Sequence, residues 1–199
     1  MTATPPGRIR LATARDAARC REIYAPAVLD LPTSFETELP DVAEMARRIE
    51  ATLARTPWLV REDPELGVVG YAYGGAHRER AAYGWTVETT VYLDPAVHGR
   101  GLGRALYGRL LGVLELQGFR LAVGGVVVPN DASVGLHRAL GFRHVGTYHG
   151  IGWKFGRAHD VAWFERPFPA AALPGQPDPV RPLPELLDDP RVRALVAED

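Results

Sequence analysis

The sequence predicts an α+β protein in which helices flank a central mixed β-sheet. Runs of β-branched and aromatic residues alternate along the chain with segments whose apolar residues keep the 3.6-residue period of a helix. Turns rich in glycine, proline and aspartate separate these segments. One strand leads through a glycine-rich turn at residues 98–103 directly into an amphipathic helix. Together these patterns indicate helices packed on a sheet.

The first half of the chain contains four expected strands and two expected helices. The strands lie at residues 9–12, 58–61, 68–74 and 85–93. Thr13 and Asp16 form a capping-box-like start to a helix that runs to residue 28. Asp41 opens a second helix, whose apolar residues form one buried stripe as far as residue 53. The polar turn between the second and third strands predicts a hairpin.

The second half is expected to complete the sheet. It contains a helix at residues 102–117 that Gly118 ends, a strand at 121–128, a short helix at 131–140 capped by Asn130 or Asp131, and strands at 142–148 and 160–168. From Pro169 onward the composition changes to alanine, proline and acidic residues. We therefore predict one domain over residues 1–168 and a proline-rich C-terminal extension over residues 169–199. The extension is either a linker or an ordered arm with a short helix near residues 192–197.

Length and charge exclude several classes of protein. A chain of 199 residues suits one well-buried domain. The net charge of −1 and the pI near 6.6 give no electrostatic reason to bind nucleic acid or an anionic membrane, and no uncharged stretch approaches the length that a bilayer requires. The single cysteine, Cys20, excludes an intrachain disulfide and is expected in the core. Together with a start that lacks an apolar signal core, it predicts a cytoplasmic protein.

The glycine-rich turn is suited to an anionic ligand. Gly99, Gly101 and Gly103 lack a β carbon, so the backbone can adopt positive φ and approach a ligand closely. The free N–H groups of the following helix, together with Arg100 and Arg104, would attract phosphate oxygens. The spacing fits neither the dinucleotide fingerprint G-x-G-x-x-G/A nor the G-K-[ST] of a P-loop. Such turns also serve packing alone, so the flanking sequence has to identify the ligand.

The turn also matches the pattern Q/R-x-x-G-x-G/A, with His98 in place of the usual glutamine or arginine. It resembles the acetyl-coenzyme A loop of the GNAT superfamily of N-acetyltransferases. The segments that are similar to the phosphinothricin and methionine sulfoximine acetyltransferases of this superfamily are PWLV (57–60), AYGWTVETTVYL (82–93), GLGRALYGRLL (101–111), PNDASVGLHRALGF (129–142) and HDVAWFERPF (159–168). The resemblance implies the GNAT fold, acetyl-CoA as co-substrate and a glutamate-like amino acid as acceptor of the acetyl group at its α-amino nitrogen. It also implies a homodimer with the acceptor pocket near its interface.

Glu88 is the expected general base. Side chains of a strand alternate between two faces, and Glu88 shares its face with Thr86, Thr90 and Tyr92. Glutamate is depleted in strands, and burial would make its carboxylate readier to take a proton at neutral pH. Transfer to an amine needs such a base, because an ammonium has no lone pair to attack a thioester. The alternative is a carboxylate neutralised by an arginine or exposed on an edge strand; the match to the family's catalytic glutamate favours the catalytic role.

His137 is the second catalytic candidate. The GNAT helix pattern N-x-x-[AS]-x-x-[LM]-Y is filled by Asn130, Ser133, Leu136 and His137, with histidine in place of tyrosine as in the phosphinothricin branch. In many members of the superfamily this tyrosine protonates the departing thiolate. An imidazole, which changes its charge near neutral pH, could donate to the sulfur or assist deprotonation. The alternative is a histidine at the rim of the helix, bonded to a carbonyl.

The resemblance also implies the contacts of the co-substrate. In the superfamily the backbone of the strand before the loop pairs with the pantetheine arm, and the asparagine at the start of the later helix adds a polar contact. The residues expected to bind acetyl-CoA are Val91, Tyr92, Leu93, Gly99, Arg100, Gly101, Leu102, Gly103, Arg104 and Asn130. Gly124 and Gly125 would let two central strands splay around the thioester, or would relieve crowding under Trp85 or Trp153.

The loop before the Glu88 strand offers contacts for the acceptor. A guanidinium fork suits a carboxylate or phosphinate, so Arg78 and Arg80 are expected to bind the acid groups of an amino acid. The residues expected to line the pocket are Phe35, Tyr83 and Thr86. No metal site is expected, because the histidines lack metal-ligand spacing. Two other functions stay open: acetylation of another small amine or a protein amine, and sensing of acetyl-CoA without turnover.

Overall fold

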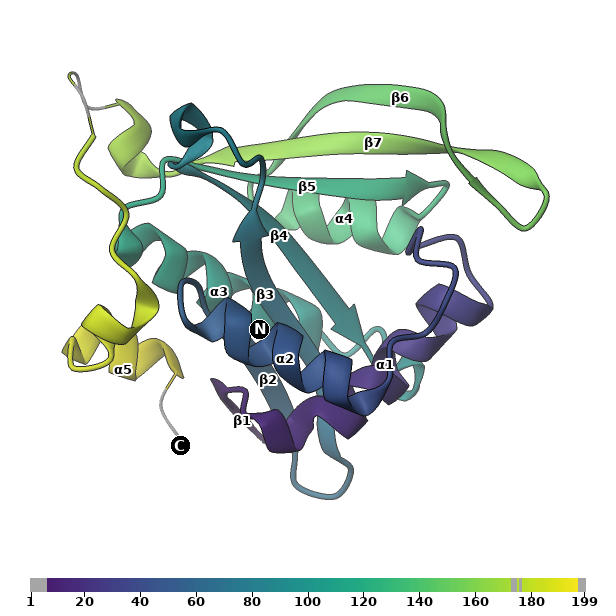
Figure 1. Cartoon of the computed structure of the whole chain (residues 1–199), viewed down its shortest axis with the longest axis horizontal. Coiled ribbons are helices and arrows are strands. Elements are labelled where there is room, and N and C mark those ends of the chain that lie inside the picture. Colours follow the sequence, from purple (N-terminus) through teal and green to yellow (C-terminus); the bar gives the residue numbers. More distant parts are fainter. Residues whose placement is uncertain (1–6, 173–174, 176, 197–199) are drawn as a thin grey trace.

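A computed structural model of the chain describes residues 7–172, 175 and 177–196 (Figure 1). Within these residues seven strands form one sheet, in the order β1-β2-β3-β4-β5-β7-β6. The strands are β1 (Arg8–Leu11), β2 (Trp58–Asp63), β3 (Gly67–Ala76), β4 (Thr86–Leu93), β5 (Leu121–Val128), β6 (Arg143–Lys154) and β7 (Arg157–Pro167). Neighbouring strands are antiparallel except for the parallel pair β4 and β5. The predicted mixed sheet and the hairpin between β2 and β3 are confirmed.

The helices begin and end where local chemistry stops the backbone ladder. They are α1 (Ala17–Leu29), α2 (Val42–Leu53), α3 (Leu102–Gln117), α4 (Asp131–Ala139) and α5 (Pro190–Val196). The side chain of Asp41 accepts a hydrogen bond from the Glu44 amide at the start of α2, and Asn130 accepts one from the Ser133 amide at the start of α4. Gly118 ends α3 in the left-handed conformation, with φ of 98°.

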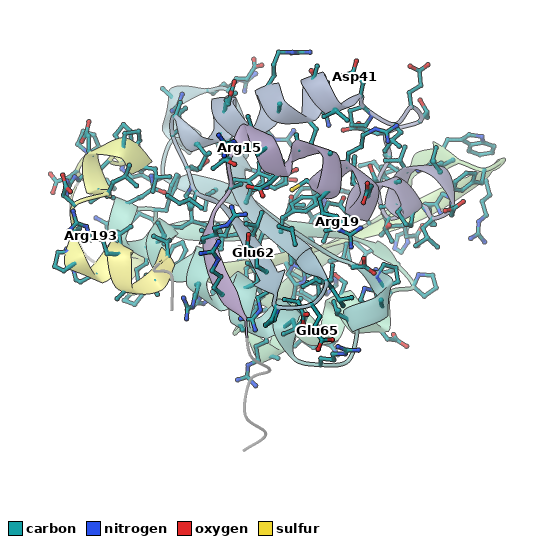
Figure 2. All side chains as sticks on the ribbon, turned by 90° about the horizontal axis from the view of Figure 1, so that it is seen from below. Arg15, Arg19, Asp41, Glu62, Glu65 and Arg193 are labelled. Atoms are coloured by element: carbon teal, nitrogen blue, oxygen red, sulfur yellow. The ribbon has the colours of Figure 1, made fainter. Side chains whose placement is uncertain are left out.

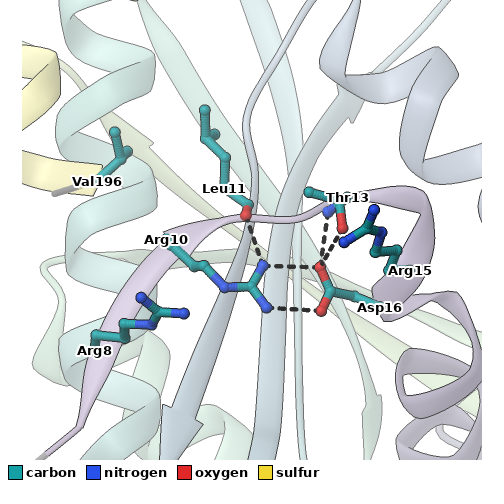
Figure 3. A pocket seen from close by; sticks show the side chains of 7 residues that line it. All are labelled: Arg8, Arg10, Leu11, Thr13, Arg15, Asp16 and Val196. Carbon is teal, nitrogen blue, oxygen red and sulfur yellow. Dashed lines mark hydrogen bonds and ion pairs between the residues drawn. The ribbon is translucent and has the colours of Figure 1, made fainter. Parts of the chain in front are cut away.

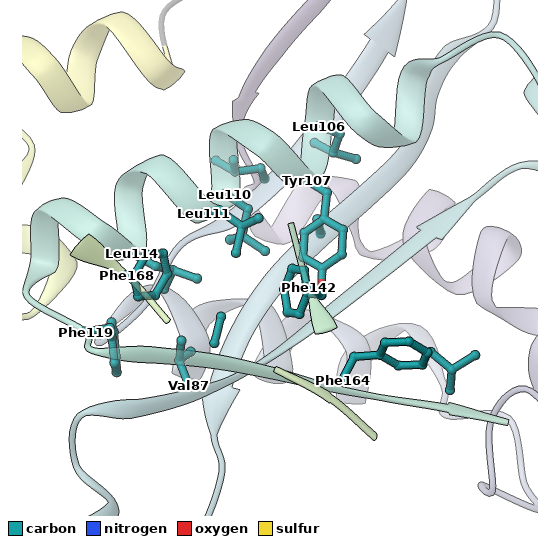
Figure 4. Packing of buried hydrophobic residues seen from close by; sticks show 14 of the residues in the cluster. Val87, Leu106, Tyr107, Leu110, Leu111, Leu114, Phe119, Phe142, Phe164 and Phe168 are labelled. Carbon is teal, nitrogen blue, oxygen red and sulfur yellow. The ribbon is translucent and has the colours of Figure 1, made fainter. Parts of the chain in front are cut away.

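Helices cover both faces of the sheet. The β2 side chains alternate, so Trp58 and Val60 pack with α1 and α2 while Leu59 packs with α3. Figure 2 shows α1 and α2 on one side of the sheet, with Asp41 at the start of α2. Figure 4 shows the opposite core, where the leucines of α3 meet Phe164 of β7 and three aromatic residues next to strand ends, Phe119, Phe142 and Phe168. Cys20 is fully buried between α1 and the sheet, as expected.

The central pair of strands separates after three residues. β4 pairs with β5 only through Thr86, Val87 and Glu88, which lie opposite Leu121, Ala122 and Val123. β5 stays paired with β7 as far as Val128, and β4 stays paired with β3 as far as Leu93. A gap therefore opens in the middle of the sheet beyond Glu88. This opening is the feature of the fold that positions the site.

The last two strands are longer than the sequence predicts. The expected strands at residues 142–148 and 160–168 left the segment between them as a loop, but β6 and β7 extend to a turn at Phe155 and Gly156. Both turn residues have positive φ, 51° and 72°. Glycines and polar residues give the distal part of β6 weak strand propensity, and its pairing with β7 shifts register twice. Backbone pairing with the neighbouring strand, which local propensity does not reveal, forms this hairpin.

The C-terminal extension packs against α3 along residues 177–196. A separate apolar cluster joins Val113 of α3 to Leu183, Leu186 and Val192. The side-chain amide of Gln117 donates hydrogen bonds of 2.7 Å to two backbone carbonyls, those of Arg55 and Arg181. The described part of the extension is thus an ordered arm; α5 covers most of the helix expected at residues 192–197, and residues 197–199 lie outside the described part. Among the described residues, no helix has the length and apolar character needed to span a bilayer.

Candidate active site

The glycine turn between β4 and α3 has the conformation that its sequence requires. Gly99 and Gly101 both have φ of 77°, which L-residues with a side chain rarely adopt. A β carbon at either position would meet nothing within 4 Å, so the backbone conformation, and not crowding, requires glycine. Gly101 is the N-cap of α3, and the side chains of Arg100 and Arg104 are exposed beside it. The turn therefore presents the first amides of a helix and two cations at the same place.

Gly103 and His98 tie this turn to the end of β4. A β carbon on Gly103 would lie 3.1 Å from a methyl group of Leu93, so the first turn of α3 packs closely on the strand. The exposed His98 ring donates a hydrogen bond from Nε2 to the Leu93 carbonyl, at 3.2 Å. His98 thus closes back on the strand. Its hydrogen bond uses the backbone carbonyl of Leu93, the last residue of the segment expected to pair with pantetheine (Val91 to Leu93).

Glu88 lies at the point where β4 and β5 separate. Its carboxylate is 40% exposed, so the burial expected from the sequence is only partial. The Oε2 atom lies 3.2 Å from Nδ1 of His77, the residue that follows β3. No arginine pairs with Glu88 among the described residues. The carboxylate is thus accessible and bonded to a side chain that can exchange a proton with it.

The face of the sheet that carries Glu88 also carries an aromatic cavity. The cavity has a volume of about 310 Å³ and is lined by Tyr24, Met45, Arg48, Ala51, Thr52, Trp58, Tyr71 and Tyr73. The rings of Trp58 and Tyr73 stack with their centroids 4.3 Å apart. Tyr73 lies opposite Thr90, two residues after Glu88 on the same face of β4, and burial raises the pKa of the Tyr73 hydroxyl. An apolar wall therefore begins beside the carboxylate.

His137 lies on the opposite face of the sheet, in the core under α3 and α4. It is buried, and its Nδ1 lies 2.8 Å from the Ser133 carbonyl oxygen. Since a carbonyl can only accept, Nδ1 carries the proton. Burial lowers the pKa of the His137 imidazole, and the bond to Ser133 opposes that shift only in part. The ring is therefore neutral near pH 7, with its lone pair on Nε2.

A hydroxyl chain connects His137 to the strand that bears Glu88. The Tyr107 hydroxyl lies 3.3 Å from Nε2 of His137 and 2.6 Å from Oγ1 of Thr89. Thr89 is the neighbour of Glu88 on β4, and its Oγ1 also lies 3.0 Å from the Val123 carbonyl oxygen of β5. Sequence reasoning did not identify Tyr107, because at its position in α3 it reads as one more residue of the buried stripe.

Gly124 and Gly125 of β5 lie beside the gap between β4 and β5, and neither Trp85 nor Trp153 is among their nearest neighbours. A β carbon on Gly124 would lie 2.8 Å from Nε2 of His137, closer than real β carbons approach other atoms. On Gly125 it would meet Val161 at 3.3 Å and Trp163 at 3.5 Å. The alternative explanation, that these glycines relieve crowding under Trp85 or Trp153, is wrong; Gly124 makes room for the His137 imidazole. The strands separate at Gly124, as predicted.

The residues expected to bind the acceptor fall into two groups. Arg78, Arg80 and Tyr83 lie exposed on the loop between β3 and β4, and Tyr83 contacts His77 with ring centroids 5.9 Å apart. Neither arginine forms an ion pair within the described ranges. Thr86 lies half-buried on the same strand as Glu88. Phe35 belongs to the loop between α1 and α2, where its ring covers Gly152 of β6.

A second cavity, of about 710 Å³, lies at the other end of the sheet, by β1 (Figure 3). It is lined by Arg8, Arg10, Leu11, Thr13, Arg15, Asp16 and Val196. Arg10 donates two hydrogen bonds of 2.8 Å to the Asp16 carboxylate and also pairs with Glu62. The cavity is larger than the aromatic one, but neither Glu88 nor any residue of the glycine turn is among its lining residues. Because its carboxylates are already bonded to arginine, we assign the chemistry to the gap between β4 and β5.

Comparison with known proteins identifies the fold and its ligand. The family model for the acetyltransferase (GNAT) domain matches residues 9–163. The chain belongs to the GNAT acetyltransferases. Phosphinothricin N-acetyltransferase of Streptomyces viridochromogenes is 41% identical to this GNAT chain over 181 residues, which cover 91% of the chain and 97% of the relative. L-methionine sulfoximine/L-methionine sulfone acetyltransferase of Salmonella typhimurium is 37% identical over 168 residues, 83% of this chain and 97% of the relative.

A solved GNAT structure agrees with this assignment. The phosphinothricin acetyltransferase of Sinorhizobium meliloti, determined in complex with acetyl-CoA, superposes with a TM-score of 0.82 and 35% identity, over 89% of this chain and 96% of that one. The predicted superfamily, branch and fold are therefore confirmed, and the GNAT chain is an enzyme that uses acetyl-CoA as co-substrate. The free glycine turn at the start of α3 fits the phosphates of that molecule.

Proposed function

We propose that the protein acetylates the α-amino group of an amino acid similar to phosphinothricin or methionine sulfoximine, with Glu88 as general base. The observation that carries the proposal is the position of Glu88: an accessible carboxylate at the last residue where β4 and β5 are paired. A thioester held in the gap beyond that residue would lie next to the carboxylate. The relatives named phosphinothricin and methionine sulfoximine acetyltransferases support the choice of acceptor.

The co-substrate would be held by backbone groups along one path. The edge of Val91, Tyr92 and Leu93 that faces β5 is not paired with it, so this edge can bond to the pantetheine arm. The turn from Gly99 to Gly103 and the first residue of α3, Leu102, would hold the pyrophosphate, with Arg100 and Arg104 beside it. Asn130 uses its side-chain oxygen to cap α4, which leaves its side-chain amide for a polar contact.

In the proposed reaction each proton has an acceptor. Glu88 takes a proton from the ammonium of the acceptor, and the freed lone pair attacks the thioester carbon. The nitrogen then gives up a second proton, the C–S bond breaks, and the thiolate leaves with the bonding electrons and takes up that second proton. His137 contributes as a hydrogen-bond acceptor, because its Nδ1–H is bound to the Ser133 carbonyl and its Nε2 carries the lone pair. The single proton of the Tyr107 hydroxyl is donated to Nε2 when Thr89 donates to Tyr107 in place of the Val123 carbonyl. This favours assistance to deprotonation over donation to sulfur.

The acceptor would be bound between charge and aromatic surface. Arg78 and Arg80, which have no ion-pair partner in the described part of the chain, can bind the carboxylate and the phosphinate or sulfoximine group. Tyr83, Thr86 and Phe35 would line the entrance, and the aromatic cavity under Tyr73 would receive the apolar part of the side chain. An amino acid whose short aliphatic chain ends in a second group with an acceptor oxygen, a phosphinate or a sulfoximine, fits this combination.

A homodimer is part of the proposal. β6 is an edge strand of the sheet, and exposed apolar side chains lie along it and at its turn: Val145, Tyr148, Ile151, Trp153 and Phe155. Trp153 alone is 73% exposed. Apolar residues on an unpaired edge are typical of a surface that another chain covers. Phe35 packs on the same hairpin, so a second subunit seated there would lie close to the acceptor entrance.

The test is thiol release from acetyl-CoA with phosphinothricin, methionine sulfoximine, methionine sulfone and ordinary amino acids as acceptors. Glu88→Gln should lower kcat by about 10²- to 10⁴-fold with the preferred acceptor. Glu79→Gln, in the exposed loop nearby, is the matched control and should keep wild-type kcat. Turnover of Glu88→Gln at the wild-type rate would refute the general-base role. Binding of acetyl-CoA without turnover of any acceptor would instead indicate a sensor.

A further inference from the structure

His77 lies where a partner of Glu88 is needed. β3 and β4 are antiparallel, with Gly75 opposite Glu88, so the residue two positions after Gly75 falls on the same face as the carboxylate. Its Nδ1 is 3.2 Å from Oε2 of Glu88. The two side chains differ in accessibility, since His77 is 18% exposed and Glu88 is 40% exposed. The imidazole therefore lies behind the carboxylate while the carboxylate itself stays open.

Two aromatic residues fix the orientation of the His77 ring. Tyr83 and Trp163 both meet it edge to face, with centroids at 5.9 and 5.8 Å and interplanar angles of 77° and 74°. These contacts come from the loop after β3 and from β7, so the ring is held from two elements. Nε2 of His77 forms no hydrogen bond within the described ranges. One ring nitrogen is thus bonded to Glu88 and the other is available to water.

The groups around Glu88 and His77 include no other charged partner for the carboxylate within the described residues. Two tyrosine hydroxyls interact electrostatically with Glu88, those of the half-buried Tyr73 on β3 and the buried Tyr107 on α3, and desolvation raises the pKa of both. Glu36 and Arg48, which act on Tyr73 from the loop after α1 and from α2, pair with each other. In the described part of the chain, no cation other than a protonated His77 forms an ion pair with Glu88.

We propose that His77 is the positioning residue of Glu88 and the acceptor of the proton that Glu88 removes from the substrate. The inference rests on the proposed general-base function. Transfer of acetyl from the thioester to an ammonium yields an amide, a thiol and one surplus proton, which must leave the site in every turnover. In the Nε2–H tautomer of His77, the O–H bond of the Glu88 carboxylic acid breaks, a new N–H bond forms at Nδ1, and Nε2 releases its proton to water. Glu88 is then ionised again and Nδ1–H donates to it. Before the next turnover the ring returns to the Nε2–H tautomer by exchanging protons with water.

An imidazole suits this task because the bond survives both charge states. When Glu88 is ionised, Nδ1–H donates to it; when Glu88 is protonated, its hydroxyl donates to the Nδ1 lone pair. The carboxylate therefore keeps one orientation throughout the cycle. In His77→Asn the side-chain amide can take the place of Nδ1–H and keep the hydrogen bond to Glu88, but an amide cannot accept and release a proton. That difference separates positioning from proton transfer.

The experiment compares His77→Asn, His77→Ala and the exposed control His144→Ala for kcat, KM and their pH dependence. We expect His77→Asn to lower kcat about tenfold with little change in either KM, and His77→Ala to lower it further. Added imidazole should raise the kcat of His77→Ala with increasing concentration and leave wild type and His144→Ala unchanged. The pH dependence of kcat in both His77 variants should also differ from that of wild type.

The outcomes separate this inference from the proposed function. If Glu88→Gln loses activity while both His77 variants keep wild-type kcat and pH dependence, His77 has no role and the general base stands. If His77→Ala is slow but imidazole fails to restore it and His77→Asn equals wild type, His77 only positions Glu88 and the proton-transfer part is overturned. If Glu88→Gln stays fully active, the proposed function itself fails.

Discussion

The ring of Phe35 lies directly on the backbone of Gly152. A β carbon at Gly152 would come within 2.0 Å of the ring, a separation that no packing can accommodate. The contact joins the loop after α1 to the hairpin of β6 and β7, and His159 touches the same ring with centroids 6.3 Å apart. Glycine at residue 152 therefore determines the position of Phe35, which we propose lines the entrance for the acceptor.

Gly152→Ala should displace Phe35 and weaken binding of the acceptor. We expect KM for the amino acid to rise about tenfold while KM for acetyl-CoA stays within twofold, because one apolar contact in a binding pocket is worth about 1–3 kcal/mol. Steady-state kinetics with each substrate varied in turn would measure both values. Gly146→Ala, on the same strand with open space around its β carbon, is the control. Equal increases in the two KM values would show that Phe35 does not act on the acceptor.

Lys154→Met should destabilise the fold. The buried Lys154 ammonium donates to the carbonyl oxygens of Ser34, Leu31 and Ala27 at 2.7, 3.1 and 3.2 Å. Methionine would fill the space but remove the Lys154 donor from all three carbonyls, of which only Ala27 keeps another donor among the described residues, the Ser34 amide. We expect a loss of about 2–4 kcal/mol in the free energy of unfolding. Urea unfolding followed by fluorescence would measure it. The exposed Arg157→Met, beyond the same turn, should change stability by less than about 0.5 kcal/mol; a similar loss in both variants would contradict the explanation.

The neutral state of His137 predicts a pH dependence of stability. Burial lowers its pKa in the folded protein below the ordinary value of 6.5, so the unfolded chain binds the proton more readily. The stability that this group contributes is therefore present above pH 6.5 and is lost as the pH falls toward its folded pKa. The melting temperature of wild type should drop between pH 7.5 and 5.5, and that of His137→Gln should drop less. Parallel melting curves of the two proteins across this range would rule out His137 as the cause.

Gly124→Ala should damage catalysis through His137. The added methyl group would overlap Nε2 of the ring, and either the imidazole or β5 must move, at a cost of about 1–3 kcal/mol in stability. We expect kcat to fall at least about tenfold, since an acid–base group displaced from its partner loses most of its effect. Gly135→Ala, on α4 itself with nothing near its β carbon, is the control and should keep full activity. A Gly124→Ala enzyme with wild-type kcat would place His137 outside the reaction.

Local signals in the sequence were sufficient for most of the fold. Periodicity and capping residues such as Asp41, Asn130 and Gly118 predicted the helices, since these residues bond to the backbone of their own helix. The hairpin of β6 and β7 was missed because its strands depend on each other and their glycines obscure the period of two. The packing of the C-terminal arm against Val113 depends on contacts far apart in the chain, which composition does not encode.

The candidate site shows the same division. Glu88 and the glycine turn could be predicted because each has a local pattern, an acidic residue in a strand and a fixed glycine spacing. His77 and Tyr107 could not, since their roles come from strand register and from a helix crossing the sheet. The register of the hairpin that joins β3 to β4 would have placed His77 on the face of Glu88, had the pairing of Gly75 with Glu88 been known. The roles of these residues stay predictions for the experiments above.

Lys154 is the only lysine in the chain, and arginine supplies the rest of the 23 basic residues. Acetyl-CoA is itself a reactive thioester, and a lysine amine can be modified by it without a catalyst, whereas a guanidinium keeps its charge. The cations beside the turn proposed to hold the co-substrate are the arginines Arg100 and Arg104, so they cannot be neutralised in this way, and the one lysine is buried against three carbonyls. The chain therefore offers no exposed lysine to its own donor, and lysine-directed labels would find none on the folded protein.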